Sequence, residues 1–344
     1  MTLSQDFPTN TRVSTDSFPV NPAKSSWFVP LGRSPEPIPV PGRNCTIRPD
    51  VSLSSMTSFR VGGPAELYVA PRQVEDLLAS LEWAETRGLP ITLLGAGSNL
   101  LVSDRGLPGL VISTRHLRRI EFDAETGRVT AGAGEPLPRL AWQAAERGWT
   151  GLEWAVGIPG TIGGAVVMNA GAHTSCMADL LVNTQVFTLD GSVDRLTPAD
   201  LNYSYRTSAL QISSQSPPHQ VRLVAQATLQ LQPGADPAKV LETTTAHLNN
   251  RRTTQPYHLP NCGSVFRNPT PYKAGWLIEQ TGLKGYQIGG AQVAQRHANF
   301  ILNCGGATAT DIFHLIQHIQ ETVEQHWSLL LEPEVKMLGE FQMA

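Results

Sequence analysis

The spacing of apolar side chains predicts strands and helices in alternation near the start of the folded chain. Residues 67–70 form an apolar run of strand length, and apolar residues then recur at helical spacing over 74–84. Gly88 follows them as a helix stop. The apolar run 91–95 comes next and leads directly into a glycine-rich turn. The pattern therefore predicts a strand–helix–strand unit, with a further strand at 110–113.

The middle of the chain carries the two-residue alternation that is typical of strands with one buried face. The segment 128–134 has strand character, and a helix is expected near 140–147. Apolar residues alternate over 182–186 and again, almost without a break, over 221–231. We therefore expect a mainly β region after the helix.

Helical spacing returns in the last third of the chain. Asp236 is a suitable N-cap for a helix that we expect to run to about Asn249. A short helix is predicted over 274–280, and a longer one begins at Thr308 with a capping-box pattern. The apolar run 328–338 predicts a closing strand.

The composition argues against several classes of protein. The chain has 344 residues, a formal net charge of −3 and no run of Lys or Arg, so a nucleic-acid surface is not indicated. Its 4 cysteines are scattered without a C-x-x-C pair, which argues against a disulfide framework or a zinc site and fits a reducing cytoplasm. No apolar run has membrane-spanning length, and no signal-peptide pattern is present. Residues 1–45 are rich in Pro and Ser and are expected to form a disordered arm.

Two uncharged, glycine-rich segments are the main candidates for ligand binding. The segment 156–172 is too broken by Gly and Pro to be a helix, and too apolar to be an ordinary surface loop. The segment GAGSN (95–99) follows a predicted strand, where successive N–H groups can form a nest for phosphates. Taken alone, GAGSN fits a tight turn equally well. Together, the two segments favour a dinucleotide with an aromatic ring system.

Three polar positions outside these loops are candidates for catalysis. Arg206 lies in an otherwise uncharged segment, and its planar guanidinium group could clamp a carboxylate or simply face solvent. Ser264 could be a nucleophile, a proton donor, a phosphate ligand or a structural turn residue, and no G-x-S-x-G elbow is present. In LEPEV (331–335), we expect at least one of the two glutamates to be partly enclosed, which would raise its pKa and let it act as an acid.

Seven segments of the chain occur in the order that is found in one known family. They are TSFRVGGPAE (57–66), LGAGSNLLVSD (94–104), GLEWAVGIPGTIGGAVVMNAGA (151–172), YSYRTS (203–208), GSVFRNP (263–269), AGWLIEQTGLKGYQIGGAQVAQRHANFILN (274–303) and LEPEV (331–335). With these segments the chain resembles the UDP-N-acetylenolpyruvoylglucosamine reductase (MurB) family of peptidoglycan synthesis, from about residue 50 onward. Only a few residues separate GSVFRNP from AGWLIEQ, so the chain resembles the shorter type, which lacks a tyrosine-bearing loop.

The resemblance implies an α+β fold in which a two-lobed FAD-binding domain of the vanillyl-alcohol-oxidase (PCMH) type precedes a smaller α/β substrate-binding domain. The implied boundaries are 46–233 for the FAD-binding domain, with lobes of about 46–115 and 116–233, then 234–330 for the substrate-binding domain and 331–344 for a C-terminal strand with a catalytic glutamate. The implied FAD-binding residues all lie in the two glycine-rich segments. They are Gly95, Ala96, Gly97, Ser98, Asn99, Gly157, Ile158, Pro159, Gly160, Gly163, Gly164, Asn169 and Gly171.

The resemblance also implies a reaction. NADPH reduces non-covalently bound FAD, and hydride then passes to the terminal alkene carbon of UDP-N-acetylglucosamine enolpyruvate, which gives UDP-N-acetylmuramate. Negative charge develops on the adjacent carbon and spreads into its carboxylate. By resemblance, Arg206 and Glu334 stabilise this charge as a cation and an acid, and Ser264 protonates the carbon. The implied substrate-binding residues are Tyr205, Asn268 and Gln287, and no metal ion is expected.

Two other functions fit parts of the pattern. One is another FAD-dependent oxidoreductase with the same cofactor fold, but an alcohol oxidase forms no enolate and would not need Arg206, Ser264 and Glu334 together. The other is a nucleotide-binding protein without catalysis, which the presence of all three side chains disfavours. The reductase is therefore the function that the sequence favours.

Overall fold

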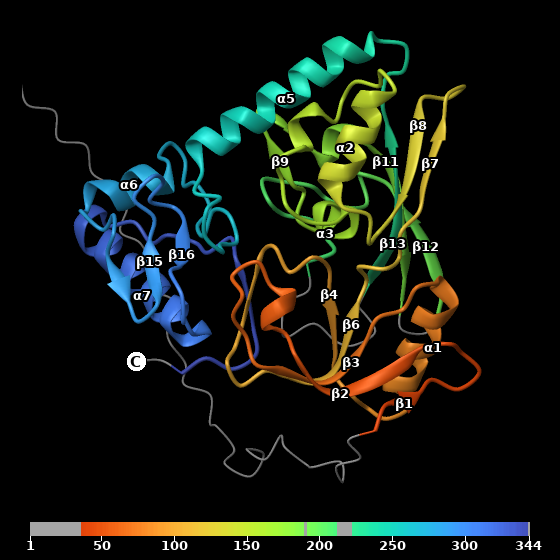
Figure 1. Ribbon diagram of the computed structural model, residues 1–344, viewed down its shortest axis with the longest axis horizontal. Coiled ribbons are helices and arrows are strands. Elements are labelled where there is room, and N and C mark those ends of the chain that lie inside the picture. The colour runs from red at the N-terminus through yellow and green to blue at the C-terminus, as the bar shows by residue number, and fades with distance from the viewer. Residues whose placement is uncertain (1–35, 189–190, 212–221, 343–344) are drawn as a thin grey trace, which may run out of the picture. The chain divides into compact units, whose positions relative to one another are not determined.

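A computed structural model describes residues 36–188, 191–211 and 222–342 of the protein. Its first sheet has the strand order β1-β2-β3-β6-β4, and β2, β3, β4 and β6 are labelled in one group in Figure 1. The bounds are β1 (Ile38–Pro39), β2 (Thr46–Ser52), β3 (Pro64–Val69), β6 (Leu107–Ser113) and β4 (Ile91–Leu94). Helix α1 (Val74–Glu85) connects β3 to β4 and packs its buried leucines into the core of this sheet. The predicted strand–helix–strand unit is confirmed.

The direction of the strands decides which loops meet. Both β3 and β4 pair with β6 in parallel, with Leu94 opposite Ser113 at the end of the β4–β6 ladder. Because parallel strands finish at the same edge of a sheet, the loop 95–99 after β4 and Arg115 after β6 come together there. This edge carries the first half of the site described below.

The second sheet has the order β12-β11-β13-β8-β7, and all of its pairs are antiparallel. Its strands are β7 (Ile120–Asp123), β8 (Arg128–Gly132), β11 (Leu181–Phe187), β12 (Val193–Leu196) and β13 (Leu223–Gln230). The mainly β region predicted from alternating apolar residues is therefore confirmed. Helices α2 (Leu137–Glu146) and α3 (Ile162–Val167) contribute to the same core as this sheet.

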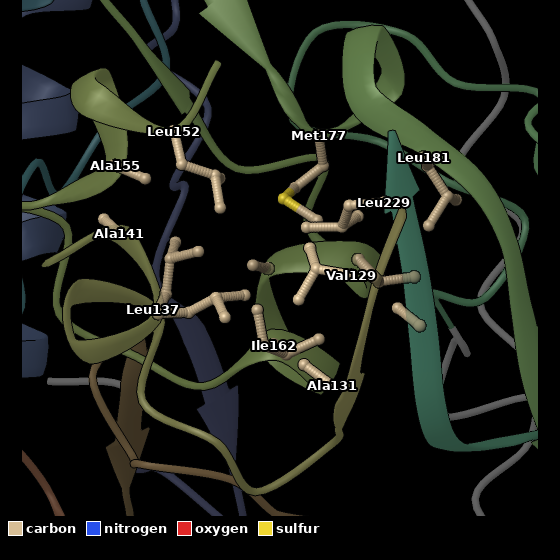
Figure 2. Packing of buried hydrophobic residues seen from close by; sticks show 14 of the residues in the cluster. Val129, Ala131, Leu137, Ala141, Leu152, Ala155, Ile162, Met177, Leu181 and Leu229 are labelled. Carbon is tan, nitrogen blue, oxygen red and sulfur yellow. The ribbon is translucent and has the colours of Figure 1, made fainter. Parts of the chain in front are cut away.

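Figure 2 shows how this core is filled. Leu137 from α2, Ile162 from α3, Val129 from β8 and Leu229 from β13 converge on one another, and each is fully buried. Burial of an aliphatic side chain of this size stabilises a fold by about 1.5–3 kcal/mol. The packing fixes the start of α3, and with it the glycine-rich segment that leads into this helix.

A third group of elements follows the long helix α5 (Pro237–Thr254), which is capped by Asp236 and runs five residues beyond its predicted end. This group consists of α6 (Ala274–Gln280), α7 (Ala309–Trp327) and a sheet of β14 (Gln287–Ile288), β15 (Ala291–Val293) and β16 (Ile301–Asn303). The predicted capping box at Thr308 is present. The Asp104 carboxylate also accepts hydrogen bonds from Ala309 N and Thr310 N, both at 2.8 Å, so a residue next to the first sheet fixes the start of α7.

The predicted closing strand at 328–338 is wrong for most of its length. Only β17 (Lys336–Leu338) is a strand, and it pairs in parallel with β5 (Leu100–Val102). Residues 332–335 instead make single hydrogen bonds and one isolated bridge, Phe266 with Pro333, to the segment 265–267. A proline has no N–H to donate, so Pro333 interrupts a regular ladder.

The prediction of a disordered arm over 1–45 also needs correction. Residues 1–35 lie outside the described part of the chain. Residues 36–45 are ordered, because β1 pairs with β2 and Val40 is only 1% exposed in the core beneath α1. Apolar side chains at Ile38 and Val40 thus outweigh the proline content of this stretch.

Short elements complete the described residues. They are η2 (Ser54–Met56), η3 (Glu153–Ala155), β9 (Gly171–Ala172), β10 (Ser175–Cys176) and α4 (Met177–Leu180). None of the helices in the described ranges has both the length and the apolar character that a membrane crossing requires. The predicted domain boundaries stay predictions, because the described residues all belong to one compact unit.

Candidate active site

Arg115 holds the first glycine-rich loop from behind. Its guanidinium group donates hydrogen bonds to the carbonyl oxygens of Gly95 (3.0 Å), Ala96 (2.7 Å) and Met56. Burial lowers the pKa of Arg115, but an arginine remains charged at neutral pH. Among the described residues, no partner is found for the backbone N–H groups of residues 96–98. Unpaired N–H groups with a cation behind them form a site for an anion.

Gly97 is required by the shape of this loop. Its φ is +68°, in the left-handed region that side chains disfavour, and a Cβ there would collide with the carbonyl oxygen of Met56. The amide of Ser58 also donates to Gly97 O, at 3.0 Å. The loop therefore lies directly on the segment after η2.

The two glycine-rich loops are in contact. Ser98 Oγ donates a hydrogen bond to Pro159 O at 2.9 Å. A Cβ added at Gly160 would lie 3.2 Å from Ser98 Oγ, and one at Gly95 would lie 3.1 Å from Thr161 Oγ1. Residues at least 61 positions apart in the sequence thus form one surface, as expected for two halves of a dinucleotide site.

The residues of this surface fit FAD. Ala96, Gly97 and Ser98 offer unpaired N–H groups for phosphate oxygens, and the uncharged segment 156–172 offers an apolar wall for a ring system. Like Gly97, other glycines of the predicted set make room for parts of the protein itself. A Cβ at Gly157 would collide with the Arg251 side chain, and one at Gly163 would lie 3.0 Å from the Ala133 methyl group.

Asn169 and Gly171, also predicted to bind FAD, connect the second loop to the Arg206 segment. Asn169 Nδ2 donates to Ser204 O at 3.0 Å, and its Oδ1 accepts from Ala178 N. Gly171 O accepts a hydrogen bond from Nη2 of Arg206 at 2.8 Å. These contacts fix the position of Arg206 relative to the loop.

Arg206 and Glu334 form a partly enclosed ion pair. Arg206 Nε lies 2.9 Å from Glu334 Oε1, and the two side chains are 22% and 14% exposed. Arg206 has φ +57° and lies in a tight turn in which Ser204 and Thr207 exchange backbone hydrogen bonds. A non-glycine residue in this region of φ is uncommon, and such strain is often found at functional sites.

Burial sets the protonation behaviour of Glu334. It raises the pKa of Glu334, and the nearby Arg206, Arg267 and Lys336 only partly offset that effect. The backbone of Glu334 is attached to the first glycine-rich loop, because Asn99 Nδ2 donates to Glu334 O at 3.0 Å. Glu334 can therefore keep a proton at a higher pH than an exposed glutamate, at a fixed place beside the loop.

Ser264 lies next to the residue that holds Glu334. Glu334 N donates a hydrogen bond to Val265 O at 2.7 Å. Ser264 is half-buried, and within the described ranges its hydroxyl makes no hydrogen bond. Burial, and secondarily the charge of Glu334, raises the pKa of the neighbouring Cys262 thiol, which keeps it protonated and unreactive. The Ser264 hydroxyl is thus the available polar group of this segment.

Arg267 adds a second cation behind the ion pair. Arg267 Nη1 lies 3.2 Å from Glu332 Oε1, and Arg267 Nη2 donates a hydrogen bond to Arg206 O at 3.2 Å. Its Nε is buried and has no hydrogen-bond partner among the described residues. Glu332 is the exposed member of the two glutamates and Glu334 the enclosed one, as the sequence predicted for at least one of them.

Of the predicted substrate-binding residues, Tyr205 lies next to the ion pair, whereas Asn268 and Gln287 make no hydrogen bond to it. Tyr205 is 52% exposed, and its ring centroid lies 5.1 Å from the Arg206 guanidinium carbon. Asn268 Oδ1 accepts from Ala274 N at 3.1 Å and so holds the start of α6, while Gln287 Nε2 donates to Gly289 O. No hydrogen bond joins Asn268 or Gln287 to the Arg206–Glu334 pair, and their substrate contacts stay predictions.

Sequence reasoning missed Arg115 as a component of the site. Three arginines, Arg115, Arg118 and Arg119, lie close together in the sequence, and only Arg115 reaches the loop. The parallel pairing of β4 with β6 places Arg115 beside the loop, and a residue pattern does not reveal which strands pair.

Two family models match the chain. The one described as "FAD binding domain" matches residues 65–197, and the one described as "UDP-N-acetylenolpyruvoylglucosamine reductase, C-terminal domain" matches residues 255–338. A UDP-N-acetylenolpyruvoylglucosamine reductase from Nostoc sp. (strain PCC 7120) is 63% identical over 324 residues, which cover 94% of this chain and 93% of the relative. One from Synechocystis sp. is 57% identical over 304 residues, or 88% of this chain and 94% of the relative.

The solved structures agree with the sequence relatives. A UDP-N-acetylenolpyruvylglucosamine reductase from Thermus caldophilus matches with a TM-score of 0.71 and 34% identity, over 86% of this chain and 100% of that one. Together with the FAD-binding match, this confirms the predicted α+β fold with an FAD-binding domain. The chain therefore belongs to the UDP-N-acetylenolpyruvoylglucosamine reductase family of FAD-dependent oxidoreductases.

Proposed function

We propose that this chain reduces UDP-N-acetylglucosamine enolpyruvate to UDP-N-acetylmuramate for peptidoglycan synthesis, with NADPH as the hydride donor and non-covalent FAD as the cofactor. The ion pair of Arg206 and Glu334, at 2.9 Å and largely enclosed, carries this proposal. It lies beside the segment of Ser264 and is attached through Asn99 to the first glycine-rich loop. A cation, a carboxyl group and a hydroxyl are the groups that a reduced enolpyruvyl carboxylate would need.

Bound FAD would supply the hydride-carrier chemistry. Arg206 has further N–H groups besides Nε and the one held by Gly171 O, and these can bind the carboxylate of the substrate. With Gly171 fixing its orientation, the guanidinium group faces the charge that grows on the carboxylate during hydride transfer. Burial raises the pKa of Glu334, and in its protonated form Glu334 donates a hydrogen bond to the same charge.

Ser264 is proposed to complete the reaction. Its O–H bond breaks as a C–H bond forms at the carbon next to the carboxylate, and the serine regains its proton from solvent. A hydroxyl is a weak acid in water, so this step relies on the high basicity of the carbon. Since no protein group engages the Ser264 hydroxyl among the described residues, it is free to contact a substrate.

The proposed setting is the cytoplasm. Cys45, Cys176, Cys262 and Cys304 are all free thiols, which fits a reducing compartment. The proposed partners are small molecules, namely the nucleotide-sugar and NADPH.

Two half-reactions test the function. The purified protein should show flavin absorbance that NADPH bleaches under anaerobic conditions. Addition of UDP-N-acetylglucosamine enolpyruvate should then restore the absorbance and yield UDP-N-acetylmuramate. A bleached flavin that the substrate does not reoxidise would refute the reductase, and a flavin that oxygen alone reoxidises would favour another flavoprotein activity.

A further inference from the structure

A separate pocket of about 550 Å³ is lined by Arg252, Tyr257, His258 and Arg296. Arg252 belongs to the last turn of α5, and Tyr257 and His258 follow this helix. Arg296 comes from the loop after β15, and its Nη1 donates a hydrogen bond to Arg252 O at 3.3 Å. This hydrogen bond connects the loop after β15 to the end of α5.

The charge of the pocket is not neutralised by the protein. Both arginines are exposed, and none of the six ion pairs among the described residues includes either of them. The lining also contains no carboxylate. Two guanidinium groups in one pocket are suited to an anion with several oxygens, since each can form two parallel hydrogen bonds to it. The pocket is therefore built for an anionic ligand group.

One wall of the pocket touches the second glycine-rich loop. Tyr257 Oη donates a hydrogen bond to Gly157 O at 3.1 Å and accepts one from Arg251 Nε at the same distance. The segment that begins with Tyr257 continues to Ser264 seven residues later. A ligand held in the pocket is thus next to the loop that fits FAD and at the start of the segment that carries Ser264.

We propose that this pocket binds the diphosphate group of a nucleotide ligand. The proposal rests on the proposed function, under which two nucleotide diphosphates, the UDP-sugar and NADPH, must each reach the flavin. A diphosphate carries oxygens on two phosphorus atoms, so it can engage both Arg252 and Arg296. The exposed ring of Tyr257 and the His258 imidazole add polar groups at the rim.

Binding to the FAD-loaded protein tests the proposal without turnover. Dissociation constants for UDP-N-acetylglucosamine, NADP⁺ and NAD⁺ are measured by titration of the flavin spectrum in the wild type, Arg252→Gln and Arg296→Gln. Each substitution should weaken at least one diphosphate ligand about tenfold or more, as expected when a hydrogen bond to a charged group is lost. The control is Lys239→Gln, which removes an exposed charge about 20 Å away on the same helix.

The arms of the experiment identify the source of the diphosphate. Loss for UDP-N-acetylglucosamine alone assigns the pocket to the nucleotide-sugar, and an equal loss for NADP⁺ and NAD⁺ assigns it to the dinucleotide. A loss for NADP⁺ that spares NAD⁺ would overturn the proposal, because the pocket would then read the 2′-phosphate. The proposal would also be overturned if both arginine variants bound all three nucleotides with dissociation constants within twofold of those of Lys239→Gln.

The same data separate this proposal from the proposed function. If the wild-type protein fails to reduce the enolpyruvyl substrate while the arginine variants still lose nucleotide affinity, the function fails and the pocket stands. If the wild type turns over and the variants bind every nucleotide normally, the pocket fails and the function stands. Unchanged flavin absorbance and melting temperature in each variant exclude a folding defect as the cause.

Discussion

Arg206 Nε lies 2.9 Å from Glu334 Oε1, although 128 residues separate the two in the sequence. A different glycine-rich loop fixes each partner. Gly171 O accepts a hydrogen bond from the Arg206 side chain, and Asn169 holds the nearby Ser204, while Asn99 holds the backbone of Glu334. The ion pair can therefore form only when the two loops and the C-terminal segment are correctly placed.

Glu334→Gln should separate the two half-reactions. The amide keeps the shape of the side chain but removes the acid, so reoxidation of the flavin by the enolpyruvyl substrate should slow by about 100-fold or more. Reduction by NADPH and the flavin content should stay near wild type, because no FAD contact is changed. Stopped-flow absorbance at the flavin maximum measures both steps, and equal slowing of both would contradict the assigned role.

The raised pKa of Glu334 predicts a pH dependence. If the protonated form is the active one, the substrate half-reaction of the wild type should slow as the pH rises through this pKa, and Glu334→Gln should lack that limb. Stability follows the same sign. A folded-state pKa above the unfolded value means that the native state binds the proton more tightly, so stability falls as the pH rises from the unfolded to the folded pKa. Melting temperatures across this range should shift in favour of Glu334→Gln, and a shift in favour of the wild type would contradict burial as the dominant cause.

Ser264→Ala tests the proton donor. NADPH should bleach the flavin at a normal rate, while the substrate half-reaction should slow by about 100-fold or more. Ser264→Cys keeps a proton at this position and should recover part of the rate. Near-normal turnover in the alanine variant would show that the carbon takes its proton from another group.

Arg115→Gln should weaken FAD binding. It removes a cation and the hydrogen bonds to Gly95 and Ala96, so the dissociation constant for FAD should rise by about 10–100-fold. Flavin fluorescence during titration of the deflavinated protein measures this constant. Arg119→Gln is the control, since its ion pair with Glu121 is exposed and contributes about 1 kcal/mol at most. If both variants bound FAD alike, Arg115 would have no special role.

Gly97→Ala should destabilise the protein as well as the cofactor site. A left-handed conformation costs alanine about 1–2 kcal/mol, and the collision with Met56 O adds further strain. Gly88→Ala is a matched control, because Gly88 has φ +62° with nothing within 4 Å of an added Cβ. Urea unfolding should show a clearly larger loss for Gly97→Ala, and equal losses would mean that the loop can move away from Met56.

The sequence predicted elements better than it predicted contacts. The helix over 274–280 and the capping box at Thr308 follow from local side-chain chemistry, and both are present. The strand expected at 328–338 is mostly absent, because Pro333 breaks the ladder and the segment bonds to 265–267 instead. The segment around Val40 is ordered because β1 pairs with β2 and because Val40 shares a core with α1. The number of prolines nearby does not reveal these contacts.

The same distinction holds for the site. Motif order named Arg206, Ser264 and Glu334, and the structure brings the segments of all three together. Arg115 was missed because its role depends on two parallel strands finishing at one edge. The missing side chains of Gly157 and Gly163 make room for Arg251 and Ala133, and the FAD contacts expected for these two glycines stay predictions. A glycine pattern indicates that another group approaches the backbone closely, but it does not show whether that group is a ligand or part of the protein.

The parallel pairing of β17 with β5 has a consequence for the order of assembly. A ribosome releases β5 and the neighbouring loop long before Glu334, which comes after α7. The nascent chain thus contains the loop that fits FAD before it contains the acid. The acid takes its place only when β17 aligns with a strand that was made more than 200 residues earlier.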